Sequence, residues 1–209
     1  MSTEKGFTLL ELLVATGASL ALIAAVGSFT RAEGRMVARE TRRLELREAG
    51  RRIADAIARE LRGGGFAPVD GSFDGERDGL SVAARGRIEI RADLHGATSA
   101  SPPDGVLDAD SDERIGFLRS AARGTVSQTI GRQTASLTVD ARVPPQGLAF
   151  RYVDACGVEI TPAAGDELSE DERRRVKAVD VRVVLADGVE SLTSEVVATL
   201  RNRQGLRCP

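Results

Sequence analysis

The chain has 209 residues, of which 42% are hydrophobic, 29% charged and 3% aromatic, and its formal net charge is −2. This length suffices for one folded domain with an extension, and the near-neutral charge excludes the strongly basic signature of a nucleic-acid-binding protein. One histidine and two cysteines exclude the usual ligand sets of a structural zinc site.

The first predicted element is an apolar run over residues 7–29, FTLLELLVATGASLALIAAVGSF, whose single charged residue is Glu11. At about 1.5 Å per residue, a helix of this length crosses the hydrocarbon core of a bilayer. A secretory signal peptide has a shorter apolar run and a more basic leader than MSTEKG, so we expect a membrane helix. A plain anchor leaves Glu11 unexplained, because burying an ionised group at mid-helix costs about 2.5–3.5 kcal/mol.

The residues around Glu11 carry a resemblance to a known family. The stretch KGFTLLELLVA, which begins at Lys5, resembles the processing site of type IV prepilins and type II secretion pseudopilins. The resemblance implies that a membrane aspartyl peptidase cuts between Gly6 and Phe7, that the new Phe7 amine is N-methylated, and that Glu11 acts in assembly. In a helix that amine and Glu11 share one face, so the Glu11 carboxylate can pair with its own or a neighbour's amine. A misaligned subunit would leave a buried charge unpaired.

The charges that flank the apolar run indicate the opposite orientation. Arginines cluster after the run while Lys5 is almost alone before it, so the positive-inside rule places the body in the cytoplasm. Pilins export their body, and we follow the motif because glutamates alternate with these arginines. The expected location is therefore a single pass through the inner membrane with a periplasmic body, and then an extracellular pilus. The arginines are Arg31, Arg35, Arg39, Arg42 and Arg43, and the glutamates are Glu33, Glu40, Glu45 and Glu48.

Residues 30–62 are predicted to continue the same helix as an amphipathic second half. No proline occurs between Phe7 and Arg62, and three glycines from Gly63 supply a stop, so we expect one helix of about 84 Å. The mixed charges favour a solvated face over a coiled coil or a basic nucleic-acid-binding helix. The positions at helical spacing that should pack on a domain are Leu46, Gly50, Ile53, Ile57 and Leu61.

Residues 63–209 are predicted to form a β-rich globular domain of short strands separated by Gly, Pro and Asp. Asp187 and Gly188 are typical of a hairpin turn, and Ser169 with Glu172 has the form of a capping box that begins a helical turn over 170–176. The fold class is therefore α+β, with the second half of the long helix packed on an antiparallel sheet. The expected strands are 80–84, 87–92, 114–119, 125–130, 135–141, 148–153, 178–186 and 192–201.

Cys156 and Cys208 are the two cysteines of the chain. A bridge between them closes a loop of about 52 residues, for which loop-closure entropy gives about 4 kcal/mol of stabilisation. With an exported body and an even count we expect a structural disulfide, and the alternative is two unpaired thiols.

An acidic segment between residues 93 and 113 contains the Asp-x-Asp-x-Asp pattern of a calcium loop at Asp108, Asp110 and Asp112. The turn glycine expected next is Glu113, and the twelfth position is Arg119 where the calcium loop requires glutamate. A surface loop is therefore favoured, no metal is expected, and the three aspartates remain weak calcium candidates.

His95 lies in a loop flanked by glycine and proline, without a serine elbow, a catalytic cysteine motif or a phosphate-binding glycine pattern. We expect it to be exposed and inert. The sequence predicts neither an enzyme nor a cofactor.

Other segments resemble minor pilins of the PilW type, with J-type pseudopilins close behind: ELRGGGFAP at the end of the helix, the acidic insertion after IEIRADLHG, and GLAFRYVDACG followed by SEDERRRVKAVDVRVVL. The resemblance implies the pilin fold and a structural minor pilin, cleaved by prepilin peptidase and assembled with major and minor pilins on an inner-membrane platform as a priming or tip subunit. The domains would be a leader (1–6), a transmembrane and assembly helix (7–29), its amphipathic half (30–62) and the globular domain (63–209). The alternatives are a type II secretion minor pseudopilin and a membrane-anchored periplasmic binding protein that does not polymerise. No nucleic-acid partner is predicted.

Overall fold

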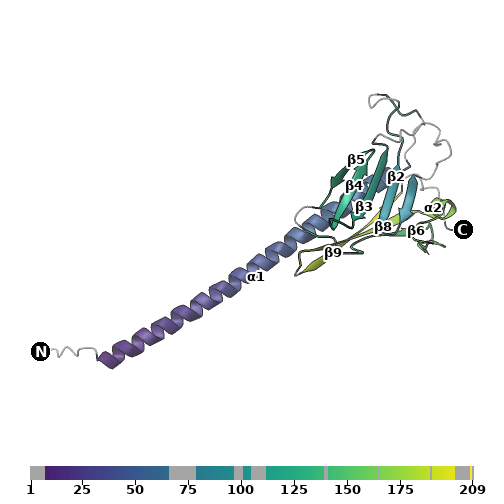
Figure 1. Ribbon diagram of the computed structural model, residues 1–209. Helices are drawn as coiled ribbons and strands as arrows, with labels where there is room; N and C mark the ends of the chain where they lie inside the picture. The colour runs from purple at the N-terminus through teal and green to yellow at the C-terminus, as the bar shows by residue number, and fades with distance from the viewer. Residues whose placement is uncertain are drawn as a thin grey trace. The chain divides into compact units, whose positions relative to one another are not determined.

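The computed structural model describes residues 8–65, 79–96, 101–104, 112–138, 141–163, 165–188, 190–200 and 208. The chain divides into two compact units, Met1–Leu44 and Glu45–Pro209. Helix α1 (Leu9–Gly63) contributes residues to both, and antiparallel strands follow it, so the predicted α+β class is confirmed (Figure 1).

Helix α1 runs for 55 residues without interruption. Glycines at 17, 27 and 34 do not break it, consistent with a cost of only about 1 kcal/mol for a single glycine in a helix. The helix ends at Gly63, one residue later than predicted, where the following glycines leave the helical conformation. Gly65 has a φ of 75°, which favours glycine, and its N–H donates to the carbonyl of Arg91 at 2.7 Å.

The body contains two antiparallel sheets, where the sequence predicted one. The first sheet is a meander of five strands in the order β1-β2-β3-β4-β5, each joined to the next along the chain. Its strands are β1 (Leu80–Ala84), β2 (Arg87–Arg91), β3 (Arg114–Ser120), β4 (Thr125–Ile130) and β5 (Gln133–Ser136).

The second sheet has the order β7-β6-β8-β9, and here chain neighbours are not all sheet neighbours because β6 pairs with both β7 and β8. Helix α2 (Glu170–Arg175) precedes β8, and Ser169 and Glu172 form the predicted capping box with both of its hydrogen bonds. The strands are β6 (Leu148–Val153), β7 (Glu159–Ile160), β8 (Ala178–Ala186) and β9 (Ser191–Thr199).

The strand predictions fail where hydrophobic alternation is weakest. Strands β1, β4, β6 and β8 have the predicted bounds, whereas β5 was expected over 135–141 and is Gln133–Ser136. All four of its residues are exposed, so β5 has no buried face from which alternation could reveal it. Strand β7 was missed because it is only two residues long. The β8–β9 hairpin lies at Asp187 and Gly188 as predicted, but its loop spans 187–190, since Ala186 pairs with Ser191.

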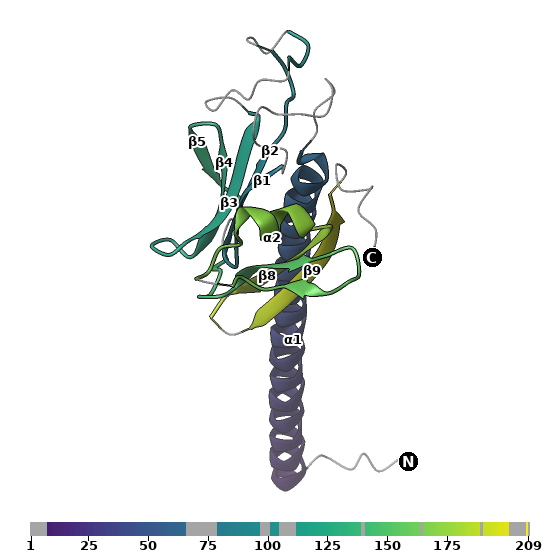
Figure 2. The ribbon, with the colours of Figure 1, turned by 90° about the vertical axis from the view of Figure 1, so that its right-hand side faces the viewer.

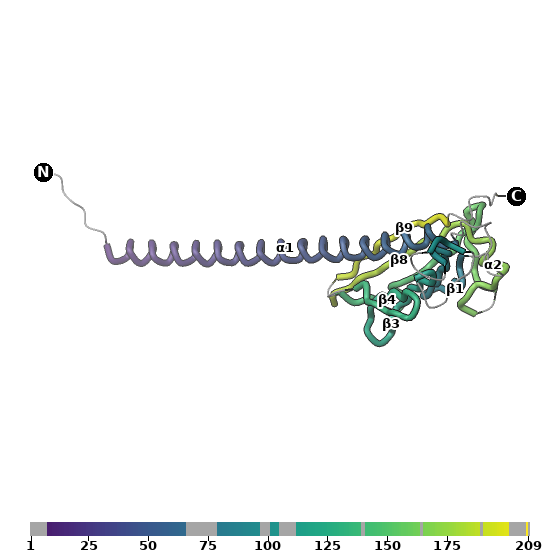
Figure 3. Tube along the Cα trace, turned by 90° about the horizontal axis from the view of Figure 1, so that it is seen from above, coloured from purple at the N-terminus to yellow at the C-terminus, as the bar shows by residue number. Residues whose placement is uncertain are grey.

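Within the body, α1 and both sheets share one apolar core. The buried positions of α1 recur at helical spacing, and Figure 3 shows this part of the helix running beside β8 and β9. Burying an aliphatic side chain contributes about 1.5–3 kcal/mol, so the core is the main source of stability. Fully buried members include Ile57 and Leu61 of α1, Ile88 and Phe117 of the first sheet, and Val179, Val181 and Val183 of the second.

The two sheets are joined at the outer edge of β1. The Tyr152 hydroxyl of β6 donates to the carbonyl of Ala84 at 2.8 Å, and the Leu168 N–H donates to the carbonyl of Ala83 at 2.9 Å. Burial raises the pKa of Tyr152 well above its ordinary value. The segment before α2 therefore lies along β1, and Figure 2 shows α2 between the two sheets.

Gly50 marks a close approach between α1 and β9. A Cβ at this position would lie 2.7 Å from Ser194 Oγ and 3.7 Å from Leu185 Cδ1, whereas a Cβ at Gly34 would meet nothing within 4 Å. We expect Gly50→Leu to lower the free energy of unfolding by about 1–3 kcal/mol through overpacking. The matched control Gly34→Leu should not lower it, because leucine has the higher helix propensity and meets no neighbour there. Urea unfolding of the detergent-solubilised chain, followed by the fluorescence of Tyr152, measures both; equal losses would contradict the packing.

Candidate functional site

Glu11 lies in the first turn of α1, not at mid-helix as expected. Its Oε2 accepts hydrogen bonds from the N–H and the Oγ1 of Thr8, both at 2.9 Å, and the Glu11 N–H donates to Thr8 Oγ1 at 3.3 Å. These reciprocal bonds form a capping box at the start of the helix. A carboxylate is electrostatically favoured there because the first N–H groups of a helix carry partial positive charge. Gly6 and Phe7, the predicted processing residues, lie outside the described residues.

The apolar part of α1 is long and apolar enough to cross a membrane, and none of it is buried within the protein. Leu9 is 81% exposed and Leu20 is 68% exposed. A contiguous exposed apolar surface of this length requires a lipid or protein partner. A single membrane span near the N-terminus is compatible with this helix.

Cys156 and Cys208 form a disulfide. Cys156 is held in the turn between β6 and β7, where Asp154 Oδ1 accepts from the Cys156 N–H at 2.8 Å and from the Val158 N–H at 2.9 Å. Gly157 in this turn has a φ of 81°. The bridge therefore attaches residue 208 to a turn that is already fixed by hydrogen bonds.

The side chain of His95 is only 12% exposed, so the expectation of an exposed histidine was wrong. Its Nε2 lies 2.6 Å from Asp112 Oδ1 and its Nδ1 lies 2.9 Å from the carbonyl of Gly96. Because acceptors face both ring nitrogens, the doubly protonated ring fits best. The hydrogen bond to Gly96, then the bond to Asp112 and the charge of Glu113, raise the pKa of His95 against the opposing effect of desolvation.

The buried carboxylate of Glu113 also binds the segment around His95. Its Oε1 accepts hydrogen bonds from the N–H groups of Leu94 and His95 at 2.9 and 3.0 Å. Of the calcium candidates, Asp112 contacts His95, whereas Asp108 and Asp110 lie outside the described residues. Among the residues that the structure describes, no three His, Cys, Asp or Glu side chains are grouped so that they could hold a metal ion.

Sequence reasoning missed the buried carboxylate of Glu89. Arg114 donates to it through Nε and Nη2 at 2.8 and 2.9 Å, and Ser81 Oγ donates at 2.6 Å. Burial alone would raise the pKa of Glu89, but these hydrogen bonds and the charges of Arg114 and Arg87 lower it overall. The cluster ties β1, β2 and β3 together, and its only sequence signal was a glutamate within an otherwise alternating strand.

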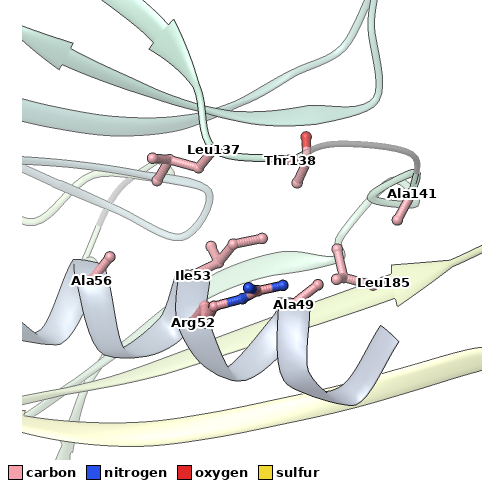
Figure 4. A pocket seen from close by; sticks show the side chains of 8 residues that line it. All are labelled: Ala49, Arg52, Ile53, Ala56, Leu137, Thr138, Ala141 and Leu185. Atoms are coloured by element: carbon pink, nitrogen blue, oxygen red, sulfur yellow. The ribbon is translucent and has the colours of Figure 1, made fainter. Parts of the chain in front are cut away.

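A pocket of about 370 Å³ lies between α1 and the segment after β5 (Figure 4). Its lining is mostly apolar, and Arg52 is its only charged residue, with Nη1 3.6 Å from Glu48. No pair of lining side chains forms a nucleophile and base or an acid and base. The lining residues are Ala49, Arg52, Ile53, Ala56, Leu137, Thr138, Ala141 and Leu185.

No protein-family model matches this chain, and no curated protein matches it. The comparisons therefore assign it neither a family nor an activity.

Removing the disulfide should destabilise the body. The loop it closes has a sequence separation of 52 residues, for which loop-closure entropy predicts a loss of about 4 kcal/mol. We expect Cys156→Ser with Cys208→Ser to lower the urea midpoint and to steepen the transition, because the unfolded chain without the cross-link exposes more surface. Thiol labelling of the native wild-type protein should give no reaction at either cysteine, and two reactive thiols would contradict the bridge.

The His95 contacts predict a pH dependence of stability. Because the pKa of His95 is raised in the folded state, its contribution is fully present below its ordinary value of about 6.5 and is lost as pH rises through the raised value. We expect the melting temperature of the wild type to fall between pH 6 and 8.5 more than that of His95→Ala. Asp112→Asn should reduce this difference, and identical pH profiles in all three proteins would show that the contacts contribute nothing.

Proposed function

We propose that this chain is a structural subunit of a type IV pilus system, a minor pilin that is cleaved between Gly6 and Phe7 and assembled by helix packing. The observation that carries the proposal is the carboxylate of Glu11 in the first turn of an exposed apolar helix, four residues after Phe7 in the sequence KGFTLLE. A membrane anchor needs the apolar helix and can use the Glu11 carboxylate to cap its first turn. It does not need the glycine and phenylalanine that precede this turn, which resemble a prepilin processing site.

Cleavage would supply the missing partner of Glu11. The new amine at Phe7 would be positively charged, and methylation would keep that charge. It lies four residues from Glu11, within reach of the carboxylate of its own or a neighbouring helix. In a low-dielectric surrounding, two paired charges are tolerated while either one alone is strongly penalised, so only a correctly aligned neighbour would be accepted.

The exposed side chains of α1 supply the packing surface for this assembly. Before export they would be covered by lipid in the inner membrane, and in a filament they would be covered by the helices of other pilins. The proposed partners are therefore major and minor pilins, prepilin peptidase and the inner-membrane assembly platform, with the body in the periplasm and then on an extracellular pilus. The body would adopt a pilin fold, and a priming or tip position fits a subunit of this length. A type II secretion minor pseudopilin would use the same helix in the same way.

Processing decides between this proposal and a membrane-anchored binding protein that never polymerises. We expect mass spectrometry of the mature protein to find Phe7 as an N-methylated first residue, and retention of Met1 or a cut elsewhere would exclude a pilin. In a matched variant, Glu11→Ala should be cleaved normally but be depleted at least about tenfold from sheared filaments, because an unpaired buried charge costs more than about 1.4 kcal/mol. The control Glu48→Ala, an exposed carboxylate on the same helix, should be incorporated like the wild type, and normal incorporation of Glu11→Ala would exclude the pairing.

A further inference from the structure

Two edges of opposite charge run along α1 just beyond its apolar part. At 100° per residue, four arginines fall within an arc of about 80°, and two glutamates lie about 150° away on the other side of the helix. We call the arginines the basic edge and the glutamates the acidic edge. The basic edge is Arg31, Arg35, Arg39 and Arg42, and the acidic edge is Glu33 and Glu40.

The two edges are complementary in their positions along the helix axis as well as in charge. Glu33 lies midway along the axis between Arg31 and Arg35, and Glu40 lies midway between Arg39 and Arg42, to within about 1 Å. All of these side chains are exposed apart from half-buried Arg42. Two parallel helices at the same height would therefore place each glutamate of one between two arginines of the other.

We propose that the basic edge of one copy docks on the acidic edge of a second, parallel copy of this chain. The inference rests on the membrane anchoring and helix packing proposed above. It concerns copies of this chain that lie side by side in the membrane before they enter a filament, and it names the contact that aligns their helices outside the lipid. Two copies anchored by the same span are necessarily parallel and at equal height, which is the arrangement that the spacing requires. Contact between two basic edges would instead oppose arginine to arginine.

Contacts within one helix leave the side chains of both edges available to bind a second copy. The Glu40 carboxylate lies 3.9 Å from Arg43 Nη1, with both side chains more than half exposed, and Arg35 Nε donates to the carbonyl of Arg31 at 3.2 Å. Exposed ion pairs of this kind contribute at most about 1 kcal/mol, so they do not prevent a neighbour from recruiting the same groups.

Anionic lipid head groups could contact only the part of the basic edge nearest the membrane. The head-group layer adds about 5–8 Å to each side of the hydrocarbon core. Measured along the helix from Phe29, Arg31 and Arg35 lie at about 3 and 9 Å, but Arg39 and Arg42 lie at about 15 and 20 Å. A tilt of about 20° shortens these heights by less than a tenth. A neighbouring helix reaches the whole edge.

The geometry of the contact has a consequence for assembly. Each copy uses its basic edge on one neighbour and its acidic edge on another, so the contact is heterologous. Such contacts leave one free edge of each kind at the ends of any group of copies, and they extend an array unless its rotation closes a ring.

Cross-linking of two differently tagged full-length copies tests the docking. Position 37 lies beside the acidic edge and position 38 beside the basic edge, so that Val37→Cys of one copy and Ala38→Cys of the other fall on the same side of the proposed contact. The native cysteines do not react because they form a disulfide. We expect a short bismaleimide to join Val37→Cys of one copy to Ala38→Cys of the other in membranes. Two Ala38→Cys copies are the matched control and should not be joined.

Charge reversal separates pairing from simple proximity. Reversing the whole basic edge (Arg31→Glu, Arg35→Glu, Arg39→Glu and Arg42→Glu), or the acidic edge (Glu33→Arg with Glu40→Arg), should each lower the yield of cross-linked product about fivefold or more when present in both copies. The six changes together should restore it, because each new arginine then again lies between two opposite charges. Formation of the Cys156–Cys208 disulfide in each variant shows that the body has folded. Cross-linking yields that are unchanged by the charge reversals would overturn the proposal.

Reconstitution identifies the partner. Cross-linking should be equal in vesicles of phosphatidylcholine alone and in vesicles containing phosphatidylglycerol; a requirement for phosphatidylglycerol would assign the basic edge to lipid and overturn the docking. Mass spectrometry of the same samples keeps the two proposals apart. Normal cleavage at Gly6–Phe7 without cross-linking rejects the edge contact alone, whereas cross-linking of an uncut chain from cells with prepilin peptidase rejects the pilin proposal alone.

Discussion

The packing of one face of α1 into the body is the interaction on which the rest of the structure depends. Ile57 and Leu61 are fully buried, and they belong to the same core as residues of both sheets. A sheet of four or five short strands has an apolar face that must be covered, and here residues of α1 pack in the same core as both sheets. The absence of a side chain at Gly50 allows the helix to approach β9 closely.

Charge is distributed differently in the two units. In the body, carboxylates are buried only where donors surround them, as at Glu89 with Arg114 and Ser81 and at Glu113 with two backbone N–H groups. Along α1 between residues 31 and 42, charged side chains are mostly exposed, with the arginines and the glutamates on opposite sides of the helix. Buried pairs specify one fold within the chain, while exposed and segregated charges are suited to contacts between chains.

Helix α1, four strands with their bounds, the capping box at Ser169 and the joining of Cys156 to Cys208 could be predicted, because each depends on local pattern or residue count. The division into two sheets could not, since it depends on the edge of β1 meeting β6 and residue 168, which are distant in sequence. Glu89 and His95 were missed or misjudged for the same reason: the partners that bury them lie 17 to 25 residues away. The processing and assembly roles of Gly6, Phe7 and Glu11 stay predictions.

The cap of α1 has a consequence for the order of events at the membrane. Thr8 and Glu11, which together begin the helix, both lie on the product side of the proposed scissile bond. A peptidase acting at Gly6–Phe7 would therefore remove six residues and leave both Thr8 and Glu11 in place. The subunit would leave the enzyme with its first turn already formed, and only the charge beside that turn would be new.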